Sequence, residues 1–180
     1  MMPSVHVAIA VTSVAVLYKR RGAKYWLPPL NFALHFVEDA IPHFEPDAMG
    51  WKLRKFLGPA QIWAALDILA MFYILWLAIK ALPECKNIFI WSSLAAFGPD
   101  IVQTYGSMFV RPDGGLLTRY VGFHHWIHFV IKGGWSKVTS LMVGIVDSVC
   151  LYWLAWKYWP KPDPYAVSST TVFRISAKTA

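Results

Sequence analysis

The sequence predicts an all-α, polytopic integral membrane protein with a bundle of five to six helices. Hydrophobic residues make up 57% of the 180 residues, and charged residues make up only 15%. The apolar residues also fall into long runs that short polar segments separate, as in chains that cross a bilayer several times. Because soluble domains carry about 25% charged residues, this composition excludes an ordinary soluble protein.

The first three apolar runs each predict a helix. Val5–Tyr18 would reach only about 22 Å, and its basic residues follow the run instead of preceding it, so we expect a retained helix and not a signal peptide. Tyr25–Ile41 is the second run, and Pro42 closes it. Pro59–Ala81 is the clearest membrane span of the chain, and Asp67 is its one interruption.

The second half of the chain predicts three further helices. Asn87 to about Tyr105 is the fourth run, and Gly98-Pro99-Asp100 breaks its apolar character. Arg119–Lys132 is short and rich in histidine and aromatic residues, which favours a re-entrant or interfacial helix. Val138–Trp159 is the last run, so residues 1–159 form one transmembrane domain. Prolines then end the helix, and residues 160–180 form an extended polar tail.

The basic residues predict the orientation in the membrane, because Lys and Arg accumulate on the cytoplasmic side. Placing residues 19–24, Lys80, Lys86 and the tail in the cytoplasm puts ten of the 17 basic residues there. The N-terminus then lies outside and the C-terminus inside. We assign the net charge of +7 to these flanks and to contacts with membrane lipids, and we expect no nucleic-acid partner.

Acids and histidines inside the apolar runs are the candidate functional residues, because ionisable groups in a bilayer are costly. No Lys or Arg lies in mid-span to neutralise the acids, so they need a proton, a water cavity or a metal cation. The predicted topology brings nine of these residues to the outer half of the bilayer, with Asp147 deeper. They are His6, His35, Asp39, His43, Asp67, Asp100, His124, His125 and His128.

Their spacing suits a metal site. Residues 35, 39 and 43 follow i, i+4, i+8 and share one helix face. A mixed nitrogen and oxygen set of ligands favours a divalent metal, zinc before manganese or iron. Spacing leaves open which of the histidines at 124, 125 and 128 point inward. Glu38 faces about 100° away from Asp39 and is a candidate partner of the ligands, not a ligand itself. The alternative is a structural network of buried hydrogen bonds.

The segment from His35 to Asp47 reads H-x3-D-x2-P-H-x3-D, with His6 before it and Phe123-His124-His125-Trp126-Ile127-His128 after it. Over about residues 1–130 this resembles small prokaryotic membrane-bound metal-dependent hydrolases, which are related to the LexA-regulated inner-membrane hydrolase group. The resemblance implies an inner (cytoplasmic) membrane location. It also implies a metal held at six positions: His6, His35, Asp39, His43, Asp100 and His128.

We therefore expect a membrane-embedded, metal-dependent hydrolase that acts on a lipid or a lipid-linked ester or phosphodiester. Asp67, His124 and His125 are the candidates for catalytic proton transfer. One alternative is a non-catalytic accessory subunit of a larger membrane complex, respiratory or photosynthetic, that retains the hydrolase-like fold. Another is a conduit for protons or metal ions built on the same acids and histidines.

Overall fold

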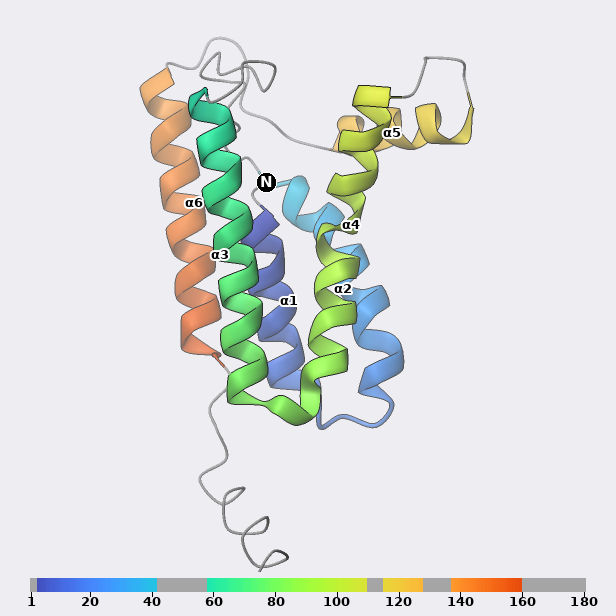
Figure 1. The fold of residues 1–180 in the computed structure, drawn as a ribbon, viewed down its shortest axis with the longest axis vertical. Coiled ribbons are helices and arrows are strands. Elements are labelled where there is room, and N and C mark those ends of the chain that lie inside the picture. Colours follow the sequence, from blue (N-terminus) through green and yellow to red (C-terminus); the bar gives the residue numbers. More distant parts are fainter. Residues whose placement is uncertain (1–2, 42–57, 110–114, 128–136, 160–180) are drawn as a thin grey trace, which may run out of the picture.

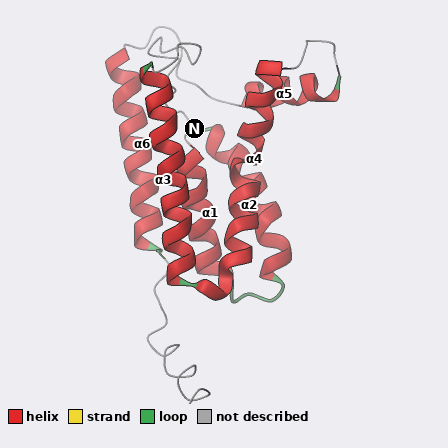
Figure 2. Cartoon of the chain, viewed as in Figure 1, coloured by secondary structure: helices red, strands yellow, loops and turns green. Residues whose placement is uncertain are grey.

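The computed structural model describes residues 3–41, 58–109, 115–127 and 137–159, and every element in these ranges is a helix (Figure 2). The predicted all-α class is therefore confirmed. The elements, labelled in Figure 1, are α1 (Pro3–Leu17), α2 (Ala23–Asp39), α3 (Pro59–Ala81), a short 3-10 helix (Pro83–Cys85), α4 (Lys86–Phe109), α5 (Leu116–Ile127) and α6 (Lys137–Lys157).

The bundle runs along one axis, and α5 lies across it at the end where α1 begins (Figure 1). Helix α1 packs against α2, α3, α4 and α6, so it occupies the centre of the bundle. The turn from α1 into α2 passes through Gly22, whose φ of 71° lies in the left-handed region that glycine adopts without strain. This turn makes the two helices antiparallel neighbours.

The fourth apolar run forms a single helix. Helix α4 continues from Lys86 to Phe109 through Gly98-Pro99-Asp100. A proline inside a helix removes one backbone hydrogen bond and crowds the preceding turn, and the continuous helix accommodates both effects. The Tyr120 hydroxyl of α5 donates to the carbonyl oxygen of Pro99 at 3.2 Å. Asp100 is thereby carried on a regular helix beside α5.

The apolar core lies toward the end of the bundle that is opposite α5. It joins residues of α1 to α4 and of the 3-10 helix, and burying each of the larger side chains contributes about 1.5–3 kcal/mol. Its members include Val7, Val11, Val14, Leu27, Ala78, Leu82, Cys85 and Phe89. The α5 end instead buries polar side chains such as His6, His35 and Asp39.

Among the described residues, one helical segment is long and apolar enough to cross a membrane, Gln61–Ala81 of α3. Helix α1 is also apolar but has only 15 residues. The predicted apolar runs thus correspond to helices, whereas the other predicted spans do not reach the length and hydropathy of a membrane crossing. In α2 and α4 the buried faces carry polar groups such as Asn31, His35 and Ser92, which lower the mean hydropathy.

Candidate metal centre

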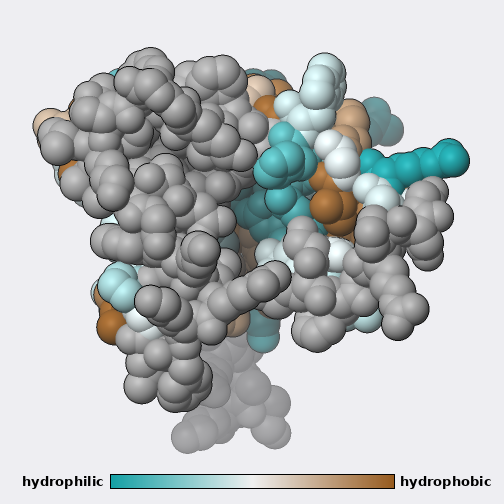
Figure 3. Space-filling view, turned by 90° about the horizontal axis from the view of Figure 1, so that it is seen from above, coloured by the Kyte–Doolittle hydropathy of each residue, from teal (hydrophilic) through white to brown (hydrophobic). Residues whose placement is uncertain are grey.

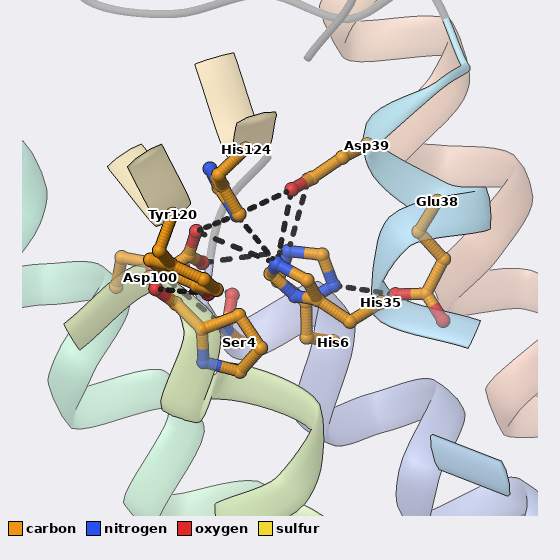
Figure 4. A network of polar contacts seen from close by, with 10 residues as sticks. Ser4, His6, His35, Glu38, Asp39, Asp100, Tyr120 and His124 are labelled. Carbon is orange, nitrogen blue, oxygen red and sulfur yellow. Dashed lines mark hydrogen bonds and ion pairs between the residues drawn. The ribbon is translucent and has the colours of Figure 1, made fainter. Parts of the chain in front are cut away.

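Five side chains from four helices converge at the α5 end of the bundle (Figure 4). Helix α1 supplies His6, α2 supplies His35 and Asp39 one turn apart, α4 supplies Asp100, and α5 supplies His124. The i, i+4 spacing on α2 places its imidazole and carboxylate on one face, as the sequence predicts. The convergence therefore depends on packing between helices that lie far apart in the sequence.

Asp39 lies at the centre of this group. Its Oδ2 is 3.0 Å from Nε2 of His35 and 3.2 Å from Nε2 of His124. Its Oδ1 is 3.4 Å from Nε2 of His6. The two nitrogens of His35 and His124 are 2.8 Å apart, and their rings stack at an interplanar angle of 28°. All three histidines thus direct Nε2 toward one carboxylate.

Asp100 forms the side of the group that faces solvent. Its Oδ2 is 3.5 Å from Nε2 of His6, and its Oδ1 is 3.8 Å from Nε2 of His35 and 3.7 Å from Nε2 of His124. The Asp100 side chain is 19% exposed, whereas the other four side chains are fully buried. Seen along the bundle axis from this end, hydrophilic residues gather near the centre (Figure 3). Access to the group is therefore from this end, past Asp100.

The chemistry and spacing of these donors fit a divalent metal. One ligand atom from each of His6, His35, Asp39 and Asp100 lies within 4.8 Å of the others. Ligands that bind zinc at about 2.0–2.2 Å in a tetrahedron are about 3.3–3.6 Å apart, which falls within the separations of 3.0–3.8 Å to the two carboxylates. Nε2 of His6 and Oδ2 of Asp100 are buried with no hydrogen-bond partner among the described residues, although burying such atoms is costly. A cation would satisfy both.

Glu38 fixes the orientation of His6. Its Oε2 lies 2.5 Å from Nδ1 of His6, and both side chains are buried. When Nδ1–H donates to this carboxylate, Nε2 carries the lone pair that faces the two aspartates. A carboxylate behind a histidine is the usual outer partner of a metal ligand, where it fixes the tautomer and raises the basicity of the ring. Glu38 therefore contacts His6 and would not itself touch a metal held by the Nε2 atoms.

Asp67 belongs to a separate polar network. It accepts a 3.4 Å hydrogen bond from the backbone N–H of Ser4 and a second, shorter one from the Ser4 hydroxyl. That hydroxyl also lies 2.5 Å from the Tyr152 hydroxyl. The network joins α1, α3 and α6 two residues before His6. Asp67 thus anchors the start of α1, a different position from the catalytic one that the sequence suggested.

The remaining predicted residues divide into two groups. His125 is exposed on α5, beside the buried His124, so the structure does not bring it to the centre. His43 and His128 lie outside the described residues, as do the side chain of Asp147 and the tail 160–180. Sequence reasoning assigned His124 to proton transfer, whereas its Nε2 lies among the candidate metal ligands.

No protein family, curated protein or solved structure matches this chain. The resemblance to membrane-bound metal-dependent hydrolases therefore remains an expectation. What the chain can do has to be argued from the geometry of the site itself. That geometry is a buried group of histidines and aspartates able to hold a metal ion.

Proposed function

We propose that this protein is a membrane-embedded, metal-dependent hydrolase that acts on a lipid or a lipid-linked ester or phosphodiester. The observation that carries the proposal is the convergence of the Nε2 atoms of His6, His35 and His124 on the carboxylates of Asp39 and Asp100. These residues would hold one divalent cation, zinc before manganese or iron. Such a cation supplies Lewis acidity and lowers the pKa of water, which is the chemistry that hydrolysis needs.

The side chains have separate roles in this proposal. Glu38 holds the His6 ring by its Nδ1, so that Nε2 stays directed into the site. The ring of Phe36 is an apolar neighbour of the site on the side of α2, 5.1 Å from the ring of His35 and 5.8 Å from that of His124. Asp100, as the partly exposed member, lies where a substrate would enter.

The distribution of side chains supports a membrane location. Polar and charged groups such as Asn31, His35 and Asp39 are buried, whereas large apolar side chains cover the outside. On α3 the exposed positions include Ile62, Leu66, Leu69, Phe72 and Trp76. A water-soluble fold places these two classes the other way round. Lipid chains would cover the apolar exterior without any further protein.

The end of the bundle opposite the site supports an orientation. Lysines there lie over aromatic rings, with Lys19 near Tyr18, Lys80 near Trp76 and Lys157 near Trp153. Basic and aromatic residues collect at membrane interfaces, the basic ones on the cytoplasmic side. We therefore place that end in the cytoplasm and the metal centre toward the outer face, with the N-terminus outside and the C-terminus inside.

Elemental analysis of detergent-purified protein tests the proposal. The wild type should carry stoichiometric zinc, manganese or iron, and the His35→Ala/Asp39→Ala double variant should carry none. The matched control is His125→Ala/Glu84→Ala, which removes an exposed histidine and an exposed acid and should keep the metal. Phospholipids and lipid-linked phosphodiesters are then screened for hydrolysis that requires the metal. A wild type without metal after growth in supplemented medium would refute the proposal.

The second candidate is an accessory subunit of a larger membrane complex, and the apolar exterior favours it as well. Helices α3 and α6 expose Trp63, Trp76, Trp153 and Trp156, and aromatic side chains are enriched at protein–protein interfaces. Co-purification in mild detergent distinguishes the two functions. A partner retained at constant stoichiometry by both wild type and His35→Ala, with no hydrolysis by either, would favour the accessory role.

A further inference from the structure

Helix α5 has two faces with different surroundings. Its inner face packs on α4 through Leu117 and Val121 and carries His124 into the metal centre. A second face, spaced i, i+3, i+7, i+10, consists of Leu116, Arg119, Phe123 and Trp126. Leu116 is 87% exposed and Trp126 is 80% exposed. The helix that completes the site thus presents apolar side chains and a cation to its surroundings.

The packing of α5 explains how it lies across the bundle. At Gly106 of α4 an added Cβ would lie 2.6 Å from Cγ2 of Val121, so the absence of a side chain at this position lets the two helices approach closely. With the other helices along the membrane normal, the crosswise direction of α5 places it in the plane of the membrane surface (Figure 1). Interfacial helices lie in this plane, with an apolar face at the boundary between headgroups and acyl chains.

The charge around α5 in the sequence is basic. Between residues 110 and 137 the chain carries Arg111, Arg119, Lys132 and Lys137 against the single acid Asp113. Basic residues next to an interfacial helix are attracted to anionic lipid headgroups, and salt weakens this attraction. Tryptophan is enriched at the same boundary. Charge and exposed aromatic residues therefore favour the same partner.

We propose that the face of α5 formed by Leu116, Arg119, Phe123 and Trp126 docks on the headgroup boundary of an anionic lipid bilayer. The docked helix brings lipid headgroups to the end of the bundle where Asp100 is accessible. The inference rests on the membrane location in the proposed function and names anionic lipids as the surface that the site faces. It requires no hydrolysis and no bound metal.

Site-directed spin labelling of the full chain in lipid nanodiscs tests the docking. The labels are placed at Trp126→Cys on the docking face and at His125→Cys, an adjacent exposed position on another face, both in a Cys150→Ser background. Cys85 can stay, because burial raises the pKa of its thiol to about 11 and leaves it protonated and slow to react with thiol reagents. Accessibility to oxygen and to a water-soluble nickel complex is measured by electron paramagnetic resonance.

In discs of phosphatidylcholine with one-quarter phosphatidylglycerol, the label at 126 should favour oxygen over nickel by several fold, and the label at 125 should favour nickel. Arg119→Glu should reduce the preference at 126 toward that at 125. Equal water exposure at both positions would overturn the docking. A label at 126 shielded from both reagents would also overturn it, because it would indicate a protein partner. Leu116→Cys repeats the measurement if the variant at 126 does not fold.

The outcome is independent of the metal. If elemental analysis finds no metal but the label at 126 lies in lipid, the docking stands and the hydrolase proposal fails. If metal is present but the label is in water, the hydrolase proposal stands and the docking fails. A preference at 126 that is the same in discs of phosphatidylcholine alone would overturn the role of anionic lipid.

Discussion

Replacing Glu38 tests whether the group of histidines and aspartates binds a metal or is only a hydrogen-bonded network. The Glu38 carboxylate lies 2.5 Å from Nδ1 of His6, and removing an outer-shell partner of this kind typically lowers metal affinity by about 10–100-fold. In free energy this is about 1.4–2.7 kcal/mol. Glu38→Gln keeps an oxygen acceptor for Nδ1–H but loses the charge, so we expect the lower end. Glu38→Ala loses the acceptor as well, so we expect the upper end.

The assay is a competition titration with a zinc chelator of known affinity, on purified protein at constant pH. Glu84→Gln is the control, because Glu84 is exposed at the opposite end of the bundle and its replacement should leave zinc affinity unchanged. Wild-type zinc affinity in both Glu38 variants would refute the reasoning about the His6 tautomer. Equal losses for Glu38→Gln and Glu84→Gln would indicate a long-range effect of charge in place of the contact.

Three further substitutions test other contacts. His124→Ala should lower zinc affinity at least about tenfold, since it removes a candidate ligand, whereas His125→Ala should leave it unchanged. Equal zinc affinities of the two variants in the same titration would show that α5 contributes no ligand. Asp67→Ala should lower the free energy of unfolding by about 1–3 kcal/mol, because it leaves the buried N–H of Ser4 without its acceptor, and Asp67→Asn should lower it by less. Thermal unfolding in detergent measures both variants, and no loss of stability in either would contradict the anchoring role. Gly106→Ala should weaken zinc binding by displacing α5, and Val121→Ala in the same chain should restore it; a double variant as weak as the single one would contradict this.

The helices were predictable because apolar runs and prolines mark them directly. Pro59–Ala81 was predicted with the bounds that the structure gives to α3. How the fourth helix passes Pro99 was not predictable in the same way. A proline weakens a helix locally, but whether the helix ends there depends on packing by elements such as α5, which the local sequence does not specify.

The metal centre was predictable in part for a similar reason. Spacing alone put His35 and Asp39 on one face. The free-energy cost of ionisable side chains in an apolar helix marked them as functional. Spacing could not show which of His124 and His125 points inward, because each stands next to an apolar residue. Only the contact of α5 with α4 turns His124 inward. The sequence placed Asp67 at the same depth as Asp100, yet Asp67 pairs with Ser4, whose hydroxyl gave no signal among many serines.

The unequal interior of the bundle has a consequence for how the protein would respond to loss of the proposed ion. One end is held by an apolar cluster that includes Val11, Leu27 and Phe89, and this cluster does not depend on any ligand. The other end gathers carboxylates and imidazoles, which in the proposed metal centre share one cation. Chelation should therefore increase amide hydrogen exchange near His6 and His124 while the Val11 end stays protected. Occupancy of the ion would then set the rigidity of the substrate-facing end alone, whereas the apolar end would stay rigid without it.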